Sequence, residues 1–532
     1  MKRTSIYLTT LLVWLLPTIS SAQQDASRID KSLSIFNDVL RQLDINYVDT
    51  LNYEDITETA INQMLRKVDP YTVYYPKKKD DDLRMLTTGK YGGIGAIIQL
   101  REVKNSKGKD ETQVIIANPY EGKPAQRNDV LAGDVLVSVD GVSTKDKQIS
   151  DVSNLLRGVP GTIVKLELLR DGQLITREFA REDIHMPPVD YYTAISNQQS
   201  AISNPLGYIA FSEFTEGSST DFKQALDDLV ATKQISGLII DLRGNGGGII
   251  EEAIRIVSNF VPKGTLVVST KGQIAVSNHT YTTTTDPAYP NLPVVIMVDK
   301  NSASAAEIVS GAMQDLKRAT LVGQRTFGKG LVQNLRPIAY DGHLKVTTSK
   351  YYLPSGRCIQ AIDYSEMQKG NKLKKDTAGG ILPDIVLNDS AKVDVTYALY
   401  SKHLFFDYSV RFHRLHDSVA SPEEFEITDT DIADFCKFLE ENEFTYETET
   451  SKYFHEMIEM AENEDIDSLT IAQLKALEPQ LKPSFQEAIQ RNKDEVKELL
   501  GAEIMERYYF QKGRIAYLLR FDEELKRAVE VF

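Results

Sequence analysis

The chain has 532 residues, which is too long for one ordinary domain and predicts about three or four. Hydrophobic residues make up 42% and charged residues 26% of the chain, as is typical of globular domains with buried cores. The net charge of −15 argues against nucleic acid or an anionic membrane as the main partner, because there is no basic surplus to neutralise phosphates.

The N-terminus has the three parts of a secretory signal peptide. Lys2 and Arg3 precede the apolar run IYLTTLLVWLL, and a small-residue site ends at Ala22. The alternative, a membrane anchor, fits less well because the run is shorter than the roughly 20 residues that span a bilayer. We therefore expect a signal peptide over residues 1–22 and an exported, periplasmic protein without stable membrane insertion.

Residues 23–82 are predicted to form a helical N-terminal region. Apolar residues share one broad helical face there, namely Ile29, Leu33, Ile35, Phe36, Leu40 and Leu43. A second helical pattern ends at Asp69-Pro70, where a proline disfavours further helix. The run KKKDDD at 77–82 is interpreted as a solvated boundary.

Residues 83–185 are predicted to form a small, mostly β domain. Val164, Leu166 and Leu168 alternate with Lys165 and Glu167, as in a half-buried strand. The other strand candidates are GGIGAIIQL (92–100), TQVIIA (112–117) and GDVLVSVDG (133–141).

Residues 186–390 are predicted to form an α/β core. The apolar runs GYIAF (207–211), GLIIDL (237–242) and PVVIMV (293–298) are each followed by a helical pattern. Such nearly continuous apolar strands suit a sheet that is buried on both faces.

Residues 391–532 are charged and helical, with capping-box patterns at Thr428/Asp431 and Ser484/Glu487. They contain no glycine-rich loop or cluster of reactive groups, so we expect a helical cap or packing domain. The two cysteines, Cys358 and Cys436, could form one disulfide or remain two thiols. No metal-ligand spacing is present in the sequence, and no metal or other cofactor is expected.

The sequence DLRGNGGG at 241–248 joins a buried strand to a helix. Backbone N–H groups at such a turn stabilise negative charge. A phosphate site is one use, but the P-loop lysine and the G-x-G-x-x-G pattern are absent. The alternatives that remain are an oxyanion hole and a tight turn that needs glycine.

Two further residues carry candidate chemistry. Ser304 begins a helix after a buried strand, although a serine there is often only an N-cap, a role that Ser302 could fill. Lys329 lies between two glycines in an apolar segment, where burial would lower its pKa and let it act as a base. A Ser–Lys dyad fits best, whereas Lys329 taken alone could be a surface lysine.

Several motifs resemble one family in the same order along the chain: KVDPYTVYY (67–75), DLRGNGGG (241–248), SASAAE (302–307), TFGKG (326–330), YYLPSGR (351–357) and GGILPD (379–384). Together they resemble the carboxy-terminal processing proteases, also called tail-specific proteases. The resemblance covers roughly residues 30–390. It implies a multidomain α/β protein with a crotonase-like protease core, a PDZ domain, and helical N- and C-terminal regions.

The resemblance also assigns roles to residues. It implies that Ser304 is the nucleophile, that Lys329 is the base and that Gln333 orients the lysine. The backbone N–H groups of Gly248 and Ala305 would form the oxyanion hole. Glu307 also falls on a family position, where a helix-stabilising role is equally compatible.

In the PDZ domain, the resemblance assigns Gly93, Ile94 and Gly95 to the loop that binds a peptide carboxylate. Arg157 lies where related proteases place an arginine that couples this domain to the active site, and a surface ion pair is the alternative.

The implied function is a serine endopeptidase that binds the free C-terminal tails of protein or peptide substrates and cleaves peptide bonds. A homo-oligomer or an adaptor protein is compatible with this reading. The alternatives are a catalytically silent PDZ scaffold and a hydrolase that uses a histidine as its base.

Overall fold

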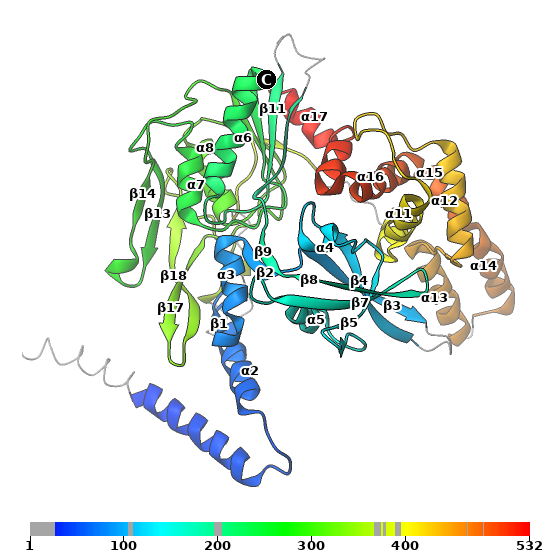
Figure 1. Ribbon diagram of the computed structural model, residues 1–532, viewed down its shortest axis with the longest axis horizontal. Coiled ribbons are helices and arrows are strands. Elements are labelled where there is room, and N and C mark those ends of the chain that lie inside the picture. The colour runs from blue at the N-terminus through cyan, green and yellow to red at the C-terminus, as the bar shows by residue number, and fades with distance from the viewer. Residues whose placement is uncertain are drawn as a thin grey trace, which may run out of the picture.

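The computed structural model describes residues 27–532 except 105–109, 196–204, 366–373, 376–378, 389–394, 465 and 482–483. The expected signal peptide, residues 1–22, lies outside the described residues. Among the residues that are described, no helix is both long enough and apolar enough to cross a membrane. N-terminal helices lead into a small β domain, an α/β core and a C-terminal helical domain (Figure 1).

The N-terminal region is helical, as predicted. A helix over residues 27–46 projects from the rest of the molecule, and its apolar face is exposed (Figure 1). The helix α2 (Tyr53–Arg66) begins at Asn52, whose side chain accepts a hydrogen bond from the Asp55 N–H. The short strand β1 (Val73–Tyr75), the 3₁₀ turn η1 (Lys77–Lys79) and the helix α3 (Asp80–Thr88) follow. The domain boundary that we placed after residue 82 falls inside α3.

The β domain contains a sheet in which β3 forms one edge, in the order β3-β4-β5-β7-β8, with β6 paired to β5. Its strands are β3 (Ala96–Lys104), β4 (Asp110–Pro119), β5 (Val135–Val139), β6 (Val142–Ser143), β7 (Ile163–Arg170) and β8 (Gln173–Ala180). The helices α4 (Pro124–Arg127) and α5 (Ile149–Leu156) lie between these strands in sequence, and β2 (Lys90–Gly93) pairs with β9 (Glu182–His185). Val164, Leu166 and Leu168 are fully buried, which confirms the predicted alternation on β7.

The α/β core is built on a sheet in the order β10-β11-β12-β15-β16-β21. Its strands are β10 (Val189–Ile195), β11 (Leu206–Phe211), β12 (Gly237–Asp241), β15 (Val294–Val298), β16 (Thr320–Gly323) and β21 (Ile385–Val386). The pairs from β11 to β21 are parallel and β10 pairs antiparallel to β11. All five residues of β12 and of β15 are buried, as the continuous apolar runs predicted.

Different helices cover the two faces of this sheet. The helices α6 (Ser218–Lys233), α7 (Ile250–Val257) and α8 (Ala305–Asp315) contribute to the core cluster on one face, with Leu238 and Ile240 of β12. Ile239, between those two residues, packs in a second cluster with Leu525 and Ala528 of the C-terminal helix α17 (Glu523–Val529). Side chains alternate along a strand, so β12 contributes to both clusters.

A second sheet lies beside the core and carries part of the site. It has the order β1-β18-β13-β14, with β17 paired to β18. Its remaining strands are β13 (Leu266–Gly272), β14 (Thr280–Thr282), β17 (Leu331–Ile338) and β18 (Gly342–Tyr352), and the turn η2 covers Ala275–Ser277. The short strands β19 (Ile362–Asp363) and β20 (Lys374–Lys375) pair with each other.

The C-terminal region is a helical domain with its own apolar core, as predicted. Its helices are α10 (Val395–Ser401), α11 (Leu404–Leu415), α12 (Asp429–Glu441), α13 (Glu449–Asn463), α14 (Ser468–Leu481), α15 (Phe485–Arg491), α16 (Lys493–Leu518) and α17. Both predicted capping boxes are present, at the starts of α12 and α15. Cys358 and Cys436 are free thiols and do not pair.

Candidate active site

Ser304 lies at the turn between β15 and α8. It occupies the N-cap position of α8 with φ 55° and ψ −114°, a left-handed conformation that a serine rarely adopts and that indicates local strain. Its N–H donates to Glu307 Oε2 at 2.9 Å, and its carbonyl accepts from the buried Tyr351 hydroxyl at 3.1 Å. Ser302 is not the cap, because its hydroxyl instead donates to Leu242 O at 2.7 Å.

The segment 241–248, called the oxyanion loop below, is tied to this turn by the fully buried Asn245. The Asn245 side chain donates to Phe211 O at 2.7 Å and accepts from the Gly247 N–H at 2.8 Å. Its carbonyl accepts from the Ala303 N–H at 2.9 Å. One asparagine thus joins the end of β11, the oxyanion loop and the Ser304 turn, a role that we did not predict from the sequence.

Two glycines let the oxyanion loop approach its neighbours closely. A Cβ at Gly247 would lie 2.7 Å from the Ala305 nitrogen and 2.7 Å from Ser304 Cβ, and one at Gly248 would lie 2.3 Å from Phe214 O. Both have positive φ angles, 96° and 143°. In the part of the chain that the structure describes, neither the Gly248 N–H nor the Ala305 N–H donates a hydrogen bond. These are the two donors that the sequence assigned to the oxyanion hole.

Glu307 connects the Ser304 turn to the segment between β16 and β17 that carries Lys329. Its fully buried carboxylate accepts four hydrogen bonds, from Ser304 N (2.9 Å), Thr326 Oγ1 (2.6 Å), Gly328 N (2.8 Å) and Lys329 N (2.9 Å). Burial raises the pKa of Glu307, while the hydrogen bonds oppose that change. A helix-stabilising role is therefore only part of what this residue does.

Lys329 is largely buried, and its side chain lies against an aromatic ring. Its Nζ is 4.7 Å from the centroid of the Tyr71 ring, a cation–π contact. Burial lowers the pKa of Lys329 from 10.5 to about 8, and the nearby Lys345 acts in the same direction, while Glu307 and Asp69 oppose it. This agrees with the burial argument from the sequence and excludes an ordinary surface lysine.

Tyr71 is held beside Lys329 by a turn in the DPYT segment. The buried Asp69 accepts hydrogen bonds from the Tyr71 N–H at 2.8 Å and the Thr72 N–H at 2.7 Å. The next residues form β1, which pairs with β18, so the N-terminal region forms one wall of the site. Sequence analysis assigned a role to neither Tyr71 nor Lys345, although Tyr71 lies in the motif KVDPYTVYY (67–75), whereas Lys345 lies in none of the motifs.

Ser304, Lys329, Gln333 and Lys345 line one cleft of about 810 Å³, together with Gly247 and Gly248. Among the described residues, no hydrogen bond joins the Lys329 ammonium to Ser304 or to Gln333. Gln333 Nε2 instead donates to Thr347 Oγ1 at 3.2 Å. The structure thus places the predicted dyad in one cleft and leaves the role of Gln333 a prediction. No histidine is among the described residues that line this cleft.

Comparisons with known proteins agree with this arrangement. Residues 205–386 match "Peptidase family S41", residues 115–170 match "PDZ domain", and residues 395–532 match "Probable PDZ-protease, C-terminal helical domain". The chain is 30% identical to a carboxy-terminal-processing protease of Bartonella bacilliformis over 67% of this chain and 75% of the relative. It is 33% identical to a carboxyl-terminal-processing protease of Synechocystis over 59% of this chain and 70% of the relative.

This chain belongs to the carboxy-terminal processing proteases of peptidase family S41. It is therefore a serine-type peptidase with a PDZ domain, as the motifs indicated. Among solved structures it is similar to an S41 protease of Bacteroides fragilis, at 16% identity and a TM-score of 0.41, over 64% of this chain and 86% of that chain.

The residues expected to bind a substrate tail lie at one edge of the PDZ domain. Gly93 ends β2, and Ile94 and Gly95 lead into the edge strand β3. The carbonyls of Ile94 and Gly95 accept hydrogen bonds from Ala125 and Tyr120 at 2.9 Å each. An edge strand that follows this loop can pair with an added peptide strand.

Arg157 ends α5 and reaches out of the PDZ domain to α3. Its guanidinium pairs with Asp82, lies 3.6 Å from Met85 Sδ and stacks over the Tyr91 ring at 5.6 Å. Met85 itself lines the catalytic cleft. The ion pair between Arg157 and Asp82 therefore joins the PDZ domain to α3, a helix that lines the cleft.

The described residues contain no group of three or more His, Cys, Asp or Glu residues that could hold a metal ion. In the cleft, this S41 peptidase has a serine hydroxyl, a lysine with a lowered pKa and two backbone N–H groups that donate no other hydrogen bond. That set suits attack on a carbonyl and stabilisation of the resulting oxyanion.

Proposed function

We propose that this chain is an exported endopeptidase that recognises the C-terminal tails of protein substrates through its PDZ domain and cleaves peptide bonds with Ser304 and Lys329. The observation that carries this proposal is the arrangement of the cleft. Ser304 lies on a strained turn beside the unengaged N–H groups of Gly248 and Ala305, and Lys329 lines the same cleft.

In this mechanism Ser304 Oγ attacks the substrate carbonyl while Lys329 accepts the hydroxyl proton. The C–N bond breaks as Lys329 returns that proton to the leaving amine, and a water molecule then hydrolyses the acyl-enzyme. The Gly248 and Ala305 N–H groups stabilise the oxyanion that forms in each step. We expect substrate binding to bring Lys329 within hydrogen-bond distance of Ser304, as catalytic hydrogen bonds often tighten in the complex.

The lowered pKa is what makes the lysine usable near neutral pH. With a pKa of about 8, about a tenth of Lys329 would be neutral at pH 7. At its ordinary value of 10.5 the neutral fraction would be only about one in three thousand.

The dyad is tested with Ser304→Ala and Lys329→Ala, assayed on an unfolded protein substrate. Both variants should lose nearly all turnover while their melting temperatures stay close to that of the parent. Ser355→Ala, which alters an exposed serine of the same core, is the control and should keep full activity. Normal turnover by the Ser304 variant would contradict the proposal. An intact parent that leaves every substrate whole would instead favour a silent scaffold.

Tail recognition is tested with matched peptides that carry a free or an amidated C-terminus. A carboxylate receives charge-assisted hydrogen bonds from the backbone donors of Gly93–Gly95, which an amide largely lacks. The free tail should therefore bind more tightly, as measured by fluorescence anisotropy on Ser304→Ala. Equal affinities would remove the tail-binding claim and leave the dyad unaffected.

Export is part of the proposal on the basis of residues 1–22 alone. N-terminal sequencing of the mature protein checks it, and a mature chain that begins at Gln23 is expected. A mature chain that retains Lys2 and Arg3 would contradict cleavage.

A further inference from the structure

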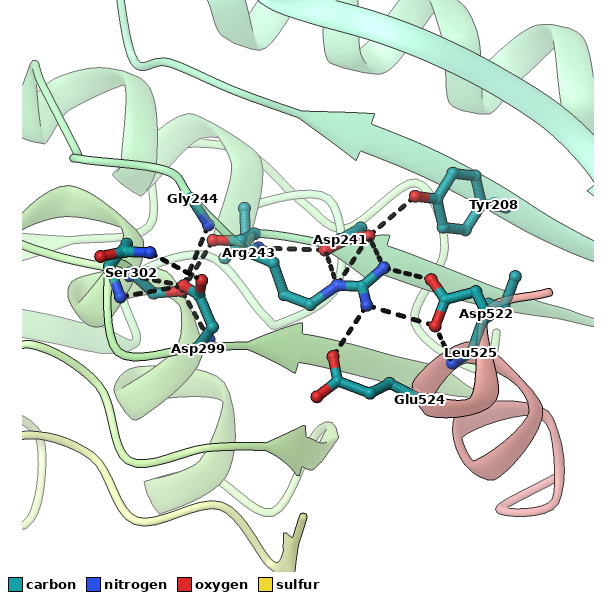
Figure 2. A network of polar contacts seen from close by, with 11 residues as sticks. Tyr208, Asp241, Arg243, Gly244, Asp299, Ser302, Asp522, Glu524 and Leu525 are labelled. Carbon is teal, nitrogen blue, oxygen red and sulfur yellow. Dashed lines mark hydrogen bonds and ion pairs between the residues drawn. The ribbon is translucent and has the colours of Figure 1, made fainter. Parts of the chain in front are cut away.

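The oxyanion loop carries two charged side chains, Asp241 and Arg243, that the mechanism above does not use. The Arg243 guanidinium lies 2.6 Å from Asp241 Oδ2, 2.6 Å from Asp522 Oδ2 and 2.8 Å from Glu524 Oε2 (Figure 2). Asp522 stands 279 residues after Arg243 in the chain. We call Arg243, Asp241, Asp522 and Glu524 the Arg243 cluster.

The cluster joins two parts of the protein that have separate cores. Asp522 and Glu524 lie at the start of α17, the last helix of the C-terminal helical domain, whereas Arg243 and Asp241 belong to the oxyanion loop (Figure 2). Tyr208 extends the cluster into the core sheet, because its hydroxyl donates to Asp241 Oδ2 at 2.7 Å. One guanidinium thus faces three carboxylates, two of which come from the C-terminal domain.

The helix α17 has apolar contacts of its own with the core sheet. Leu525 and Ala528 are buried against the core sheet, and the ring of Phe532 lies where a Cβ on Gly237 would be only 2.3 Å away. Asp522 also caps the helix by accepting the Leu525 N–H at 2.9 Å. Apolar packing therefore anchors α17 to the core sheet, and the ion pairs connect the loop to this helix.

The oxyanion loop, by contrast, borders two hollows. A second hollow of about 930 Å³ lies between the loop and α17, and Gly244 lines both this hollow and the catalytic cleft. Gly244 N donates to Asp299 Oδ1 at 2.9 Å (Figure 2). The Asn245 side chain adds a hydrogen bond to Phe211 O, and Leu242 packs in the core cluster. Because the loop borders a hollow on each side, hydrogen bonds and ion pairs contribute to its position.

We propose that the C-terminal helical domain positions the oxyanion loop through the Arg243 cluster, so that Arg243, Asp522 and Glu524 are positioning residues for the peptidase reaction. This inference rests on the proposed oxyanion role of Gly248, which lies on the same loop. Removing the carboxylates on α17 should misplace the donors during catalysis and leave substrate binding intact.

The same helical domain also contacts the PDZ domain. Arg101 of β3 forms two hydrogen bonds with Asp407 of α11, at 3.0 and 2.9 Å. Phe406 and Val410 of α11 pack with Ile115 of β4. One domain therefore contacts both the sheet that begins at the proposed tail-binding loop and the loop that holds Gly248, one of the two proposed oxyanion donors.

The test uses Asp522→Asn, Glu524→Gln and the double variant in the full chain. Asparagine keeps the cap of α17, because it is as good an N-cap as aspartate, while it removes the charge. Steady-state kinetics on a short peptide should show kcat lowered about ten-fold with KM within about two-fold of the parent, as expected for lost transition-state stabilisation. Binding of a peptide boronate, whose adduct occupies the oxyanion site, should weaken by a similar factor.

The control is Glu530→Gln, which removes the pairing of Glu530 with Arg527 on the exposed side of the same helix. Glu530→Gln should keep the parental kcat, and Glu524→Asp should recover part of the loss seen in Glu524→Gln. An unchanged kcat in the double variant, or an equal loss in Glu530→Gln, would overturn the inference. If Ser304→Ala retains turnover, the proposed function itself fails, so the two failures are distinguishable.

Discussion

At the scale of single residues, the pKa of Lys329 is set by its burial and by groups from three separate segments. Burial lowers it, Lys345 of β18 lowers it further, and Glu307 of α8 and Asp69 of the N-terminal turn oppose the change. The Tyr71 ring adds a contact that favours the charged form. Some of these groups therefore favour neutral Lys329 and others favour its charged form. Single substitutions of the two kinds should move the pKa of Lys329 in opposite directions.

Lys345→Gln removes a positive charge beside Lys329. The charged form of Lys329 then becomes easier to hold, so its pKa should rise. In the proposed mechanism only neutral Lys329 accepts the Ser304 proton, so the acid limb of the kcat/KM profile should move to higher pH by roughly half a unit to one unit. Lys350→Gln, an exposed lysine on the same strand, serves as the control. A shift to lower pH would contradict this account.

Tyr71→Leu should have the opposite effect. Leucine keeps an apolar cover over Lys329 but has no ring face, so a contact of about 0.5–2 kcal/mol with the ammonium is lost. The pKa of Lys329 should fall, and the acid limb should move to lower pH by roughly 0.4–1.5 units. Tyr71→Phe keeps the ring and should match the parent profile. Identical profiles for the leucine and phenylalanine variants would show that the ring face is not involved.

At the scale of elements, the two loops of the site are joined through glycine and asparagine contacts. Gly247 approaches Ala303, Ser304 and Ala305 more closely than any residue with a Cβ could. Asn245 and Glu307 then fix the loops on either side of that approach. The proposed oxyanion site is therefore assembled from the oxyanion loop, the Ser304 turn and the segment that carries Lys329, which follow β12, β15 and β16 of the core sheet.

Gly247→Ala should separate the oxyanion loop from the Ser304 turn. The new methyl group would lie 2.6 Å from Ala303 O at a φ of 96°, so the backbone must shift. We expect kcat to fall by roughly a hundred-fold or more, as when an oxyanion donor is lost. Gly246→Ala is the matched comparison, because a Cβ there meets nothing within 4 Å, and its loss should be far smaller. Equal kcat values for the two variants would contradict the close-approach argument.

The sequence was sufficient for those features of the site that have local patterns. The apolar runs predicted the buried strands, and the small and glycine-rich segments marked Ser304, Lys329 and the oxyanion loop. Tyr71, Lys345 and the partners of Arg243 could not be predicted, because they contact the site only after segments far apart in the chain have packed together. The sequence also did not predict that Glu307 connects the Ser304 turn to the Lys329 segment. Three of the four hydrogen bonds that its carboxylate accepts come from residues 326–329, which are distant in sequence from its own helix.

At the scale of the whole molecule, the helical regions at both ends of the chain contact the catalytic core. The N-terminal region supplies Tyr71 and one strand of the sheet that carries Gln333 and Lys345, and the C-terminal domain supplies α17. Between them the PDZ domain contacts α3 through Arg157 and α11 through Arg101. The PDZ domain therefore contacts two helices, and one of them, α3, lines the cleft through Met85.

The contact through α3 gives the last prediction. Arg157→Ala removes the ion pair with Asp82 and the contact with Met85, which lines the cleft, but leaves Gly93–Gly95 unchanged. Tail affinity should therefore persist, while kcat for long substrates with a free C-terminus falls by roughly three- to ten-fold. Short peptides that reach Ser304 directly should be affected less. Arg177→Ala, which breaks a pairing with Asp129 inside the PDZ domain, is the control and should alter neither rate. If long and short substrates lose activity equally, Arg157 only stabilises α3 and does not couple tail binding to cleavage.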